Sequence, residues 1–188
     1  MDEALHSAAD GAPPTVFMTP PIPRGFAVRL SPAGLPGAWL DVTALQGGCT
    51  GVVLGCCAET SAAERFRSDI REALLRNGDP VLSLDCVDGV DGAPISAMCA
   101  VIDSTTISYS TRGDTATAVV APDTRPTIGP EGSLSTYDLA PGATVLLSTA
   151  PIPGSSALLK TGAALHPDDL ADAVIAGPAL VGVGAVLY

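Results

Sequence analysis

The sequence is poor in aromatic and in basic side chains. It contains three Phe, three Tyr and one Trp among 188 residues, so aliphatic residues must fill most of any core. Only 9 Lys and Arg residues stand against 20 Asp and Glu residues, which gives a net charge of −11. Because nucleic-acid binding depends on Lys and Arg that neutralise phosphates, this composition disfavours a nucleic-acid partner.

A membrane span, an export signal and a cysteine motif are also missing. The most apolar stretch, residues 179–188, has the length of a buried strand and is too short to cross a membrane. The N-terminus carries acids where a signal peptide needs Lys or Arg, which predicts a cytoplasmic protein without a membrane partner. The five cysteines include no CxxC pair, so we expect small buried side chains and no disulfide framework or zinc site.

The remaining composition is that of one folded domain. Apolar residues make up 47% of the chain and charged residues 15%, which is typical of a chain that can bury a core of useful size. Residues 1–20 are rich in Ala, Gly, Pro and acid and have no periodicity, which predicts a flexible lead-in. We therefore expect a single domain over residues 21–188.

Short alternating apolar runs, separated by Gly and Pro, predict mostly strands. The runs cover residues 24–31, 37–45, 49–57, 95–103, 106–113, 115–123, 133–140, 143–150 and 179–188. The spacing predicts one hairpin around Asp103 and another around Pro141-Gly142.

Apolar periodicity and capping signals predict three helices, over residues 61–77, 80–87 and 166–177. Ser61 and Glu64 have the spacing of a capping box, and Gly78 predicts the end of the first helix. Pro80 favours the start of the second helix. The order of elements predicts an α+β fold with mainly antiparallel sheets and helices on opposite faces of a sandwich.

Five segments follow one another in an order that matches a known set of motifs. They are TPPIPRGFAVRLSPAGLPGAWLDV (19–42), VVLGCCAETS (52–61), SAMCAVIDSTTISYSTRGDTATAVV (96–120), LAPGATVLLSTAPI (139–152) and GPALVGVGAVL (177–187). Together they resemble the PPM-type, metal-dependent protein serine/threonine phosphatases of the bacterial SpoIIE-like branch. The resemblance implies a four-layer α/β/β/α sandwich of two mainly antiparallel sheets flanked by helices.

The same resemblance implies where the chemistry of the family would lie. In that family, Asp carboxylates hold two Mn²⁺ or Mg²⁺ ions, which activate a water for attack on phosphoserine or phosphothreonine. Four positions that match those ligands lack a carboxylate in this chain; they are Ala38, Cys56, Ala150 and Gly177. We therefore expect no catalytic residue, no metal site and no cofactor, whereas a weakened site would still use Mn or Mg.

A few polar side chains remain near the matching positions. Asp41 matches the second acid of the first motif, Cys57 and Glu59 belong to the second motif, and Asp114 belongs to the third. These four are candidate residual residues of the cleft. The role of Cys56 and Cys57 stays open, although thiolates suit zinc or copper(I) better than Mn²⁺ or Mg²⁺.

Three functions stay open on the sequence alone. The leading hypothesis is a pseudophosphatase that binds a protein, such as a phosphorylated anti-sigma-factor antagonist or an active phosphatase relative. The second is a metal-dependent phosphatase with a displaced site that uses Asp41, Glu59, Asp114 or Asp138. The third is a structural partner that self-associates through one sheet face.

Four arginines fall in the helix predicted over residues 61–77; they are Arg65, Arg67, Arg71 and Arg76. They are either a contact surface for the partner protein or the solvated face of a helix whose other side is apolar.

Overall fold

The computed structural model describes nine segments of the chain. The described residues are 15–18, 26–29, 37–57, 59–87, 95–113, 116–120, 132–139, 144–148 and 183–187. The elements are β1 (Thr15–Met18), β2 (Phe26–Arg29), β3 (Gly37–Ala44), a 3-10 turn (Gln46–Gly48), β4 (Thr50–Cys57), α1 (Thr60–Asn77), α2 (Pro80–Asp85), β5 (Ile95–Ile102), β6 (Thr106–Arg112), β7 (Ala116–Val120), β8 (Ser135–Asp138), β9 (Thr144–Ser148) and β10 (Val183–Leu187). The helix predicted over residues 166–177 lies outside the described residues.

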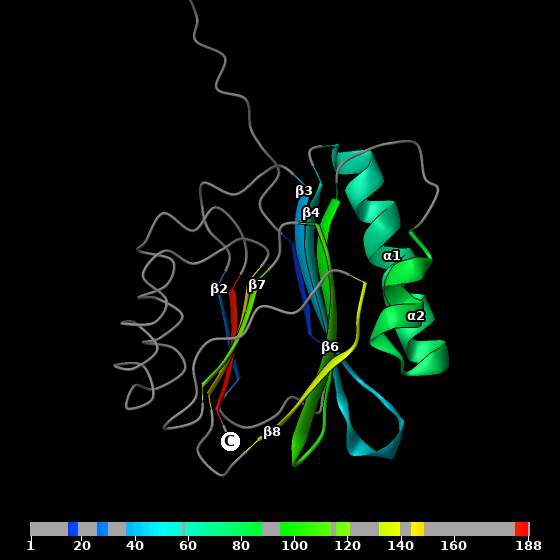
Figure 1. Cartoon of the computed structure of the whole chain (residues 1–188). Coiled ribbons are helices and arrows are strands. Elements are labelled where there is room, and N and C mark those ends of the chain that lie inside the picture. Colours follow the sequence, from blue (N-terminus) through cyan, green and yellow to red (C-terminus); the bar gives the residue numbers. More distant parts are fainter. Residues whose placement is uncertain are drawn as a thin grey trace, which may run out of the picture.

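These strands form two sheets that face each other (Figure 1). The larger sheet has the order β1-β3-β4-β5-β6-β8, and the smaller one has the order β2-β10-β9-β7. All neighbouring strands are antiparallel except β1 and β3, which are parallel. Helices α1 and α2 cover the outer face of the larger sheet (Figure 1). The predicted α+β class is confirmed.

The hairpins within the larger sheet are made by local turn chemistry. Between β3 and β4, Gly47 and Gly48 take positive φ angles of 77° and 80°, which are open to glycine without strain. Between β5 and β6, the Asp103 carboxylate accepts hydrogen bonds from the backbone N–H groups of Thr105 and Thr106, both at 2.6 Å. These bonds stabilise the ionised form and lower the pKa of Asp103 to about 2. The hairpin predicted around Asp103 is confirmed.

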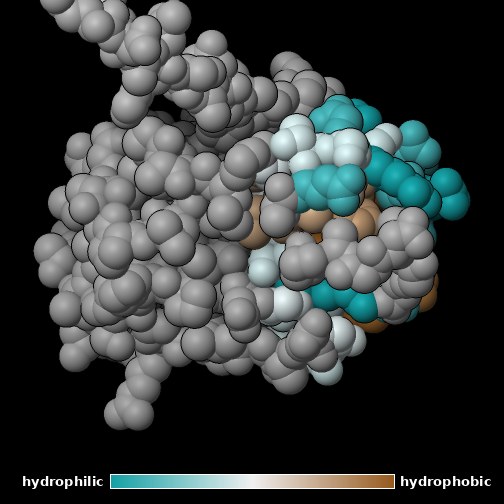
Figure 2. Space-filling view, turned by 90° about the horizontal axis from the view of Figure 1, so that it is seen from above, coloured by the Kyte–Doolittle hydropathy of each residue, from teal (hydrophilic) through white to brown (hydrophobic). Residues whose placement is uncertain are grey.

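Helix α1 packs on the larger sheet through one apolar stripe. Its buried residues are Ala63, Phe66, Ile70, Ala73 and Leu74. The opposite side carries charged residues, and the helix side of the described surface is mostly hydrophilic in Figure 2. Gly78 ends the helix in the left-handed conformation (φ 66°) and donates its N–H to the Leu74 carbonyl at 2.8 Å, as predicted.

The N-terminal caps of the two helices differ from each other. The capping box predicted at the start of α1 is wrong, because Glu59 is the N-cap residue and makes no side-chain cap hydrogen bond. Ser61 lies one residue inside the helix and donates instead to the Glu59 carboxylate at 3.0 Å. Helix α2 starts as predicted: the Asp79 carboxylate accepts from the N–H groups of Val81 (2.8 Å) and Leu82 (3.2 Å).

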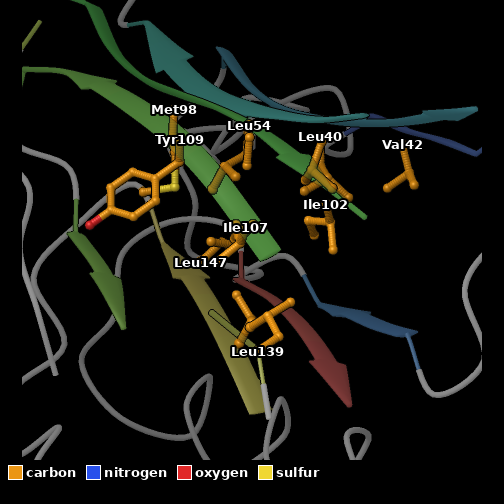
Figure 3. Packing of buried hydrophobic residues seen from close by; sticks show 12 residues of the cluster. Leu40, Val42, Leu54, Met98, Ile102, Ile107, Tyr109, Leu139 and Leu147 are labelled. Atoms are coloured by element: carbon orange, nitrogen blue, oxygen red, sulfur yellow. The ribbon is translucent and has the colours of Figure 1, made fainter. Parts of the chain in front are cut away.

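The main core lies between the two sheets. Its buried residues are Leu40, Val42, Val52, Leu54, Met98, Ala100, Ile102, Ile107, Tyr109, Leu139, Val145 and Leu147. Figure 3 shows side chains of the larger sheet directed toward Leu147 and Leu139. Burial of one such Leu or Ile stabilises the fold by about 1.5–3 kcal/mol relative to exposure. Tyr109 is the one buried ring of this cluster, and the partly buried Tyr137 stacks on it with ring centroids 5.9 Å apart.

Two predictions about the strands were wrong. Residues 15–18, which we assigned to the lead-in, form β1 and pair in parallel with β3. The strands around Pro141-Gly142 do not form a hairpin, because β8 pairs with β6 whereas β9 pairs with β7 and β10 in the other sheet. Both errors concern pairing between distant segments, which local patterns do not encode.

Candidate functional site

Two of the four positions that match the metal ligands of the resembled family lie side by side. Ala38 on β3 and Cys56 on β4 are direct cross-strand partners and pack against each other. Both are buried, with exposed fractions of 8% and 6%, and by strand alternation they share the inter-sheet face with Leu40 and Leu54. They lie near the end of the larger sheet at which β4 leads into α1 (Figure 1). Ala150 and Gly177 are outside the described residues.

The donor chemistry at this pair does not fit Mn²⁺ or Mg²⁺. Both cations prefer oxygen ligands, and carboxylates also offset the repulsion between two neighbouring cations. Ala38 presents a methyl group and Cys56 a thiol. In the described part of the chain, no group of three or more His, Cys, Asp or Glu side chains is placed to hold a metal ion.

Asp41 lies on the opposite face of β3. It points toward the helices, is 1% exposed, and accepts a hydrogen bond from Arg67 of α1 at 3.1 Å. Burial raises the pKa of Asp41 above its ordinary value of 3.8, although Arg67 and Arg71 act in the opposite direction. The structure therefore separates Asp41 from Ala38 and Cys56 by the thickness of the sheet.

The other candidate residues are also scattered. Cys57 is buried on the helix face of β4, in the cluster that contains Phe66 of α1. Glu59 is exposed just before α1, and Asp138 is exposed on β8 at the edge of the larger sheet. Asp114 is outside the described residues. Cys57, Glu59 and Asp138 therefore do not gather with the Ala38–Cys56 pair on one face of the sheet.

The cysteines divide into buried and accessible ones. Cys56, Cys57 and Cys99 are buried, as expected for small apolar side chains, whereas Cys49 is half-buried and Cys86 is exposed. Burial raises the pKa of the Cys99 thiol far above its ordinary value, so this cysteine is not nucleophilic at neutral pH.

The first turn of α1 packs closely against the end of β3 next to Ala38. A Cβ atom on Gly37 would lie 2.9 Å from the Cβ of Ala63 and would collide with the Cys57 carbonyl oxygen. Glycine at this position therefore lets the helix and two strands meet at close range. The position of α1 is thus coupled directly to the backbone beside the Ala38–Cys56 pair.

The partner of Asp41 is not evident from the sequence. Of the four arginines of α1, Arg67 is the one that contacts Asp41 on the sheet, and its side chain is only 15% exposed. Arg65, in contrast, is exposed and faces Asp69 of the same helix at 3.8 Å. The available signal was that Arg67 lies next to Phe66, Ile70 and Ala63 on the helical surface, at the border of the apolar stripe.

The fold is identified by similarity to solved structures and not by similarity of sequence. No protein-family model matches the sequence, and no curated protein is significantly similar to it. Solved structures do match, and they are PPM-type (PP2C) phosphatase domains. The chain therefore has the fold of this class of phosphatase domain, as the motif resemblance implied.

Three of these structures illustrate the likeness. The RsbU and RsbW domains of a Mycobacterium tuberculosis protein give a TM-score of 0.66 at 18% identity, covering 87% of this chain and 61% of theirs. The PP2C domain of Bacillus subtilis SpoIIE with a fragment of its regulatory domain gives 0.68 at 10% identity, over 87% and 62%. The catalytic domain of the phosphatase PstP, in complex with two manganese ions, gives 0.59 at 15% identity, over 87% and 97%. The chain thus spans less than two thirds of the first and second of these proteins.

A helix of the length and hydrophobicity that a membrane crossing requires is not found in the described part of the chain.

Proposed function

We propose that this chain is a catalytically inactive PPM-type domain that acts by binding a protein. The observation that carries the proposal is the contact between Ala38 and Cys56, two buried side chains on one sheet face. In the motif resemblance, both stand where the phosphatases have metal-binding carboxylates. A methyl group and a thiol leave two adjacent hard cations without the anionic oxygens that they need.

Asp41, the acid on the same strand as Ala38, cannot supply an inter-sheet ligand without rearrangement. Asp41 is directed to the other face of the sheet and is already hydrogen-bonded to Arg67. Because the side-chain period of a strand is two, moving Asp41 to the inter-sheet face would require a change of register in β3. Changes in residues that only support metal ligands lower metal affinity or activity about 10- to 100-fold, and loss of the ligands themselves costs more.

The proposed partner is a protein of a phospho-dependent switching circuit. The motif resemblance implies a phosphorylated anti-sigma-factor antagonist or an active phosphatase relative. In one similar structure, an RsbU domain and an RsbW domain occur together in one protein, which supports a protein ligand for this fold. The chain's net charge of −11 argues against binding to nucleic acid.

Metal binding and phosphatase activity test the proposal together. Calorimetric titration of the purified protein with Mn²⁺ should give no stoichiometric heat, and para-nitrophenyl phosphate should not be hydrolysed with Mn²⁺ present. The manganese-binding PstP domain is the positive control. One or two bound Mn²⁺ per chain, together with turnover, would overturn the proposal.

The same assay distinguishes the inactive binding domain from the second candidate, a phosphatase with a displaced metal site. If turnover appears, the variants Glu59→Gln and Asp138→Asn test whether these exposed acids contribute to it. A loss of turnover in either variant, with unchanged folding by circular dichroism, would establish the displaced site. Glu72→Gln is a matched control, because Glu72 is an exposed acid of α1.

A further inference from the structure

Asp41 is a charged residue in an interface that is otherwise mostly apolar. It lies on β3 beneath α1, with Val53 as its cross-strand partner on β4 and Trp39 two residues away on the same face. Its side chain is 1% exposed, so an ionised carboxylate there has lost almost all its hydration. Loss of hydration by a buried charge is expensive unless a partner replaces the water completely.

Arg67 replaces only part of the hydration that the buried Asp41 carboxylate has lost. Its guanidinium donates from Nη1 to the Asp41 carboxylate at 3.1 Å and from Nη2 to the Glu64 carboxylate at 2.7 Å. One cation is therefore shared between a buried acid and an exposed one. The net effect of the surroundings on Asp41 is to raise its pKa, with burial as the largest cause, so its ionised form is less favourable here than in water.

The apolar stripe of α1 does not define one position for the helix. Phe66, Ile70 and Leu74 repeat every four residues, so a slide of about one turn along the helix axis still places apolar side chains against apolar ones. Hydrophobic burial is non-directional and distinguishes weakly between such arrangements. A planar guanidinium that must meet one carboxylate on β3 distinguishes strongly between them.

We propose that the Asp41–Arg67 pair fixes where α1 sits on the sheet and does not add to the stability of the fold. Arg67 and Asp41 are positioning residues in this assignment. Because Ala63 packs on Gly37, the pair also holds the first turn of α1 against the strand end that contains Ala38. The inference depends only on the described contacts and is independent of whether the domain binds metal.

A comparison of single and double variants tests this assignment. Arg67→Met alone removes the guanidinium that is hydrogen-bonded to the buried Asp41 carboxylate, and we expect the unfolding equilibrium constant to rise at least 100-fold. Asp41→Val/Arg67→Met replaces the whole pair by apolar groups, and its unfolding constant should be equal to or lower than that of the wild type. Urea denaturation at neutral pH measures both.

Hydrogen exchange separates positioning from stabilisation, because loss of a merely stabilising pair would accelerate the α1 and β4 amides together. In the double variant, α1 amides should exchange at least tenfold faster than in the wild type, while β4 amides keep their protection. The exposed pair on the same helix gives the matched control, since Arg65→Ala/Asp69→Ala should change neither quantity. The proposal is overturned if the double variant is as unstable as Arg67→Met, or if α1 exchange is unchanged.

Discussion

The two faces of the larger sheet are built by different rules. Toward the smaller sheet, β3 and β4 present Leu40 and Leu54, in a cluster whose buried members are apolar side chains and one tyrosine. Toward the helices, β3 carries the buried Asp41, and α2 adds the fully buried Ser83. Burial of apolar area suffices to hold two sheets together, whereas polar contacts select one position for a helix on a sheet.

The largest expected effect comes from the inter-sheet face. Leu54→Ala would open a cavity between the sheets, because Leu54 is fully buried. We expect a loss of about 3 kcal/mol in the free energy of unfolding, measured by urea denaturation with an unchanged m-value. A loss below about 1 kcal/mol would mean that this core is loosely packed, and the comparison between the two faces would fail.

The next residue in β4 tests the helix face by the opposite change. Gly55 lies under the Trp39 ring, and a Cβ there would lie 2.7 Å from Cη2 and still nearer to Cζ2. Gly55→Ala should therefore overpack the interface and cost about 2 kcal/mol. Trp39→Phe removes the overlapping atoms, so the cost of Gly55→Ala should shrink in that background. Equal costs in the two backgrounds would contradict this account.

A smaller and more local effect is expected at the start of α2. Asp79→Ala removes the carboxylate that accepts from Val81 and Leu82, at a cost of about 1 kcal/mol. Asp85→Ala is the control, because Asp85 is exposed at the end of the same helix. Amide exchange should accelerate in α2 and not in β4. Equal effects of the two variants would show that the cap is unimportant.

Asp41→Asn is expected to change the free energy of unfolding least at neutral pH. The pH dependence of that change tests whether burial raises the pKa of Asp41. A carboxyl whose pKa is raised in the folded chain binds its proton more tightly there, so its contribution to stability is present below its unfolded pKa of 3.8. That contribution is lost as the pH rises through the folded pKa. The stability of the wild type relative to Asp41→Asn should therefore fall from about pH 4 upward and then level off. A rising difference would reverse the sign and contradict the burial argument.

Local patterns were sufficient for most elements of the larger sheet. The alternation and turn residues of β3, β4, β5 and β6 predicted these strands, and Gly78 and Pro80 marked the junction of the two helices correctly. The missed parts depend on partners distant in sequence. β1 lies in a stretch rich in Ala, Gly and Pro and pairs with the distant β3, and the sheet to which β9 belongs depends on β7 and β10.

For the candidate site, the residue types could be read from the sequence, but the directions of their side chains could not. The motif resemblance matches Ala38 and Cys56 to two metal-ligand positions of the family, and the structure places these two residues side by side. It also placed Asp41 and Cys57 near them, but one step along a strand turns a side chain to the opposite face. Arg67 lies 26 residues from Asp41, so their pairing was visible only after α1 was seated on β3.

The sequence by itself determined the α+β class, the net negative charge and the order of the motifs that resemble PPM-type phosphatases, because composition and order are read directly from the chain. Tertiary structure alone decided which strands share a sheet, which face each side chain joins and which arginine meets the buried acid. Those outcomes depend on contacts between distant segments, whose entropy of closure and packing geometry no single stretch of sequence contains.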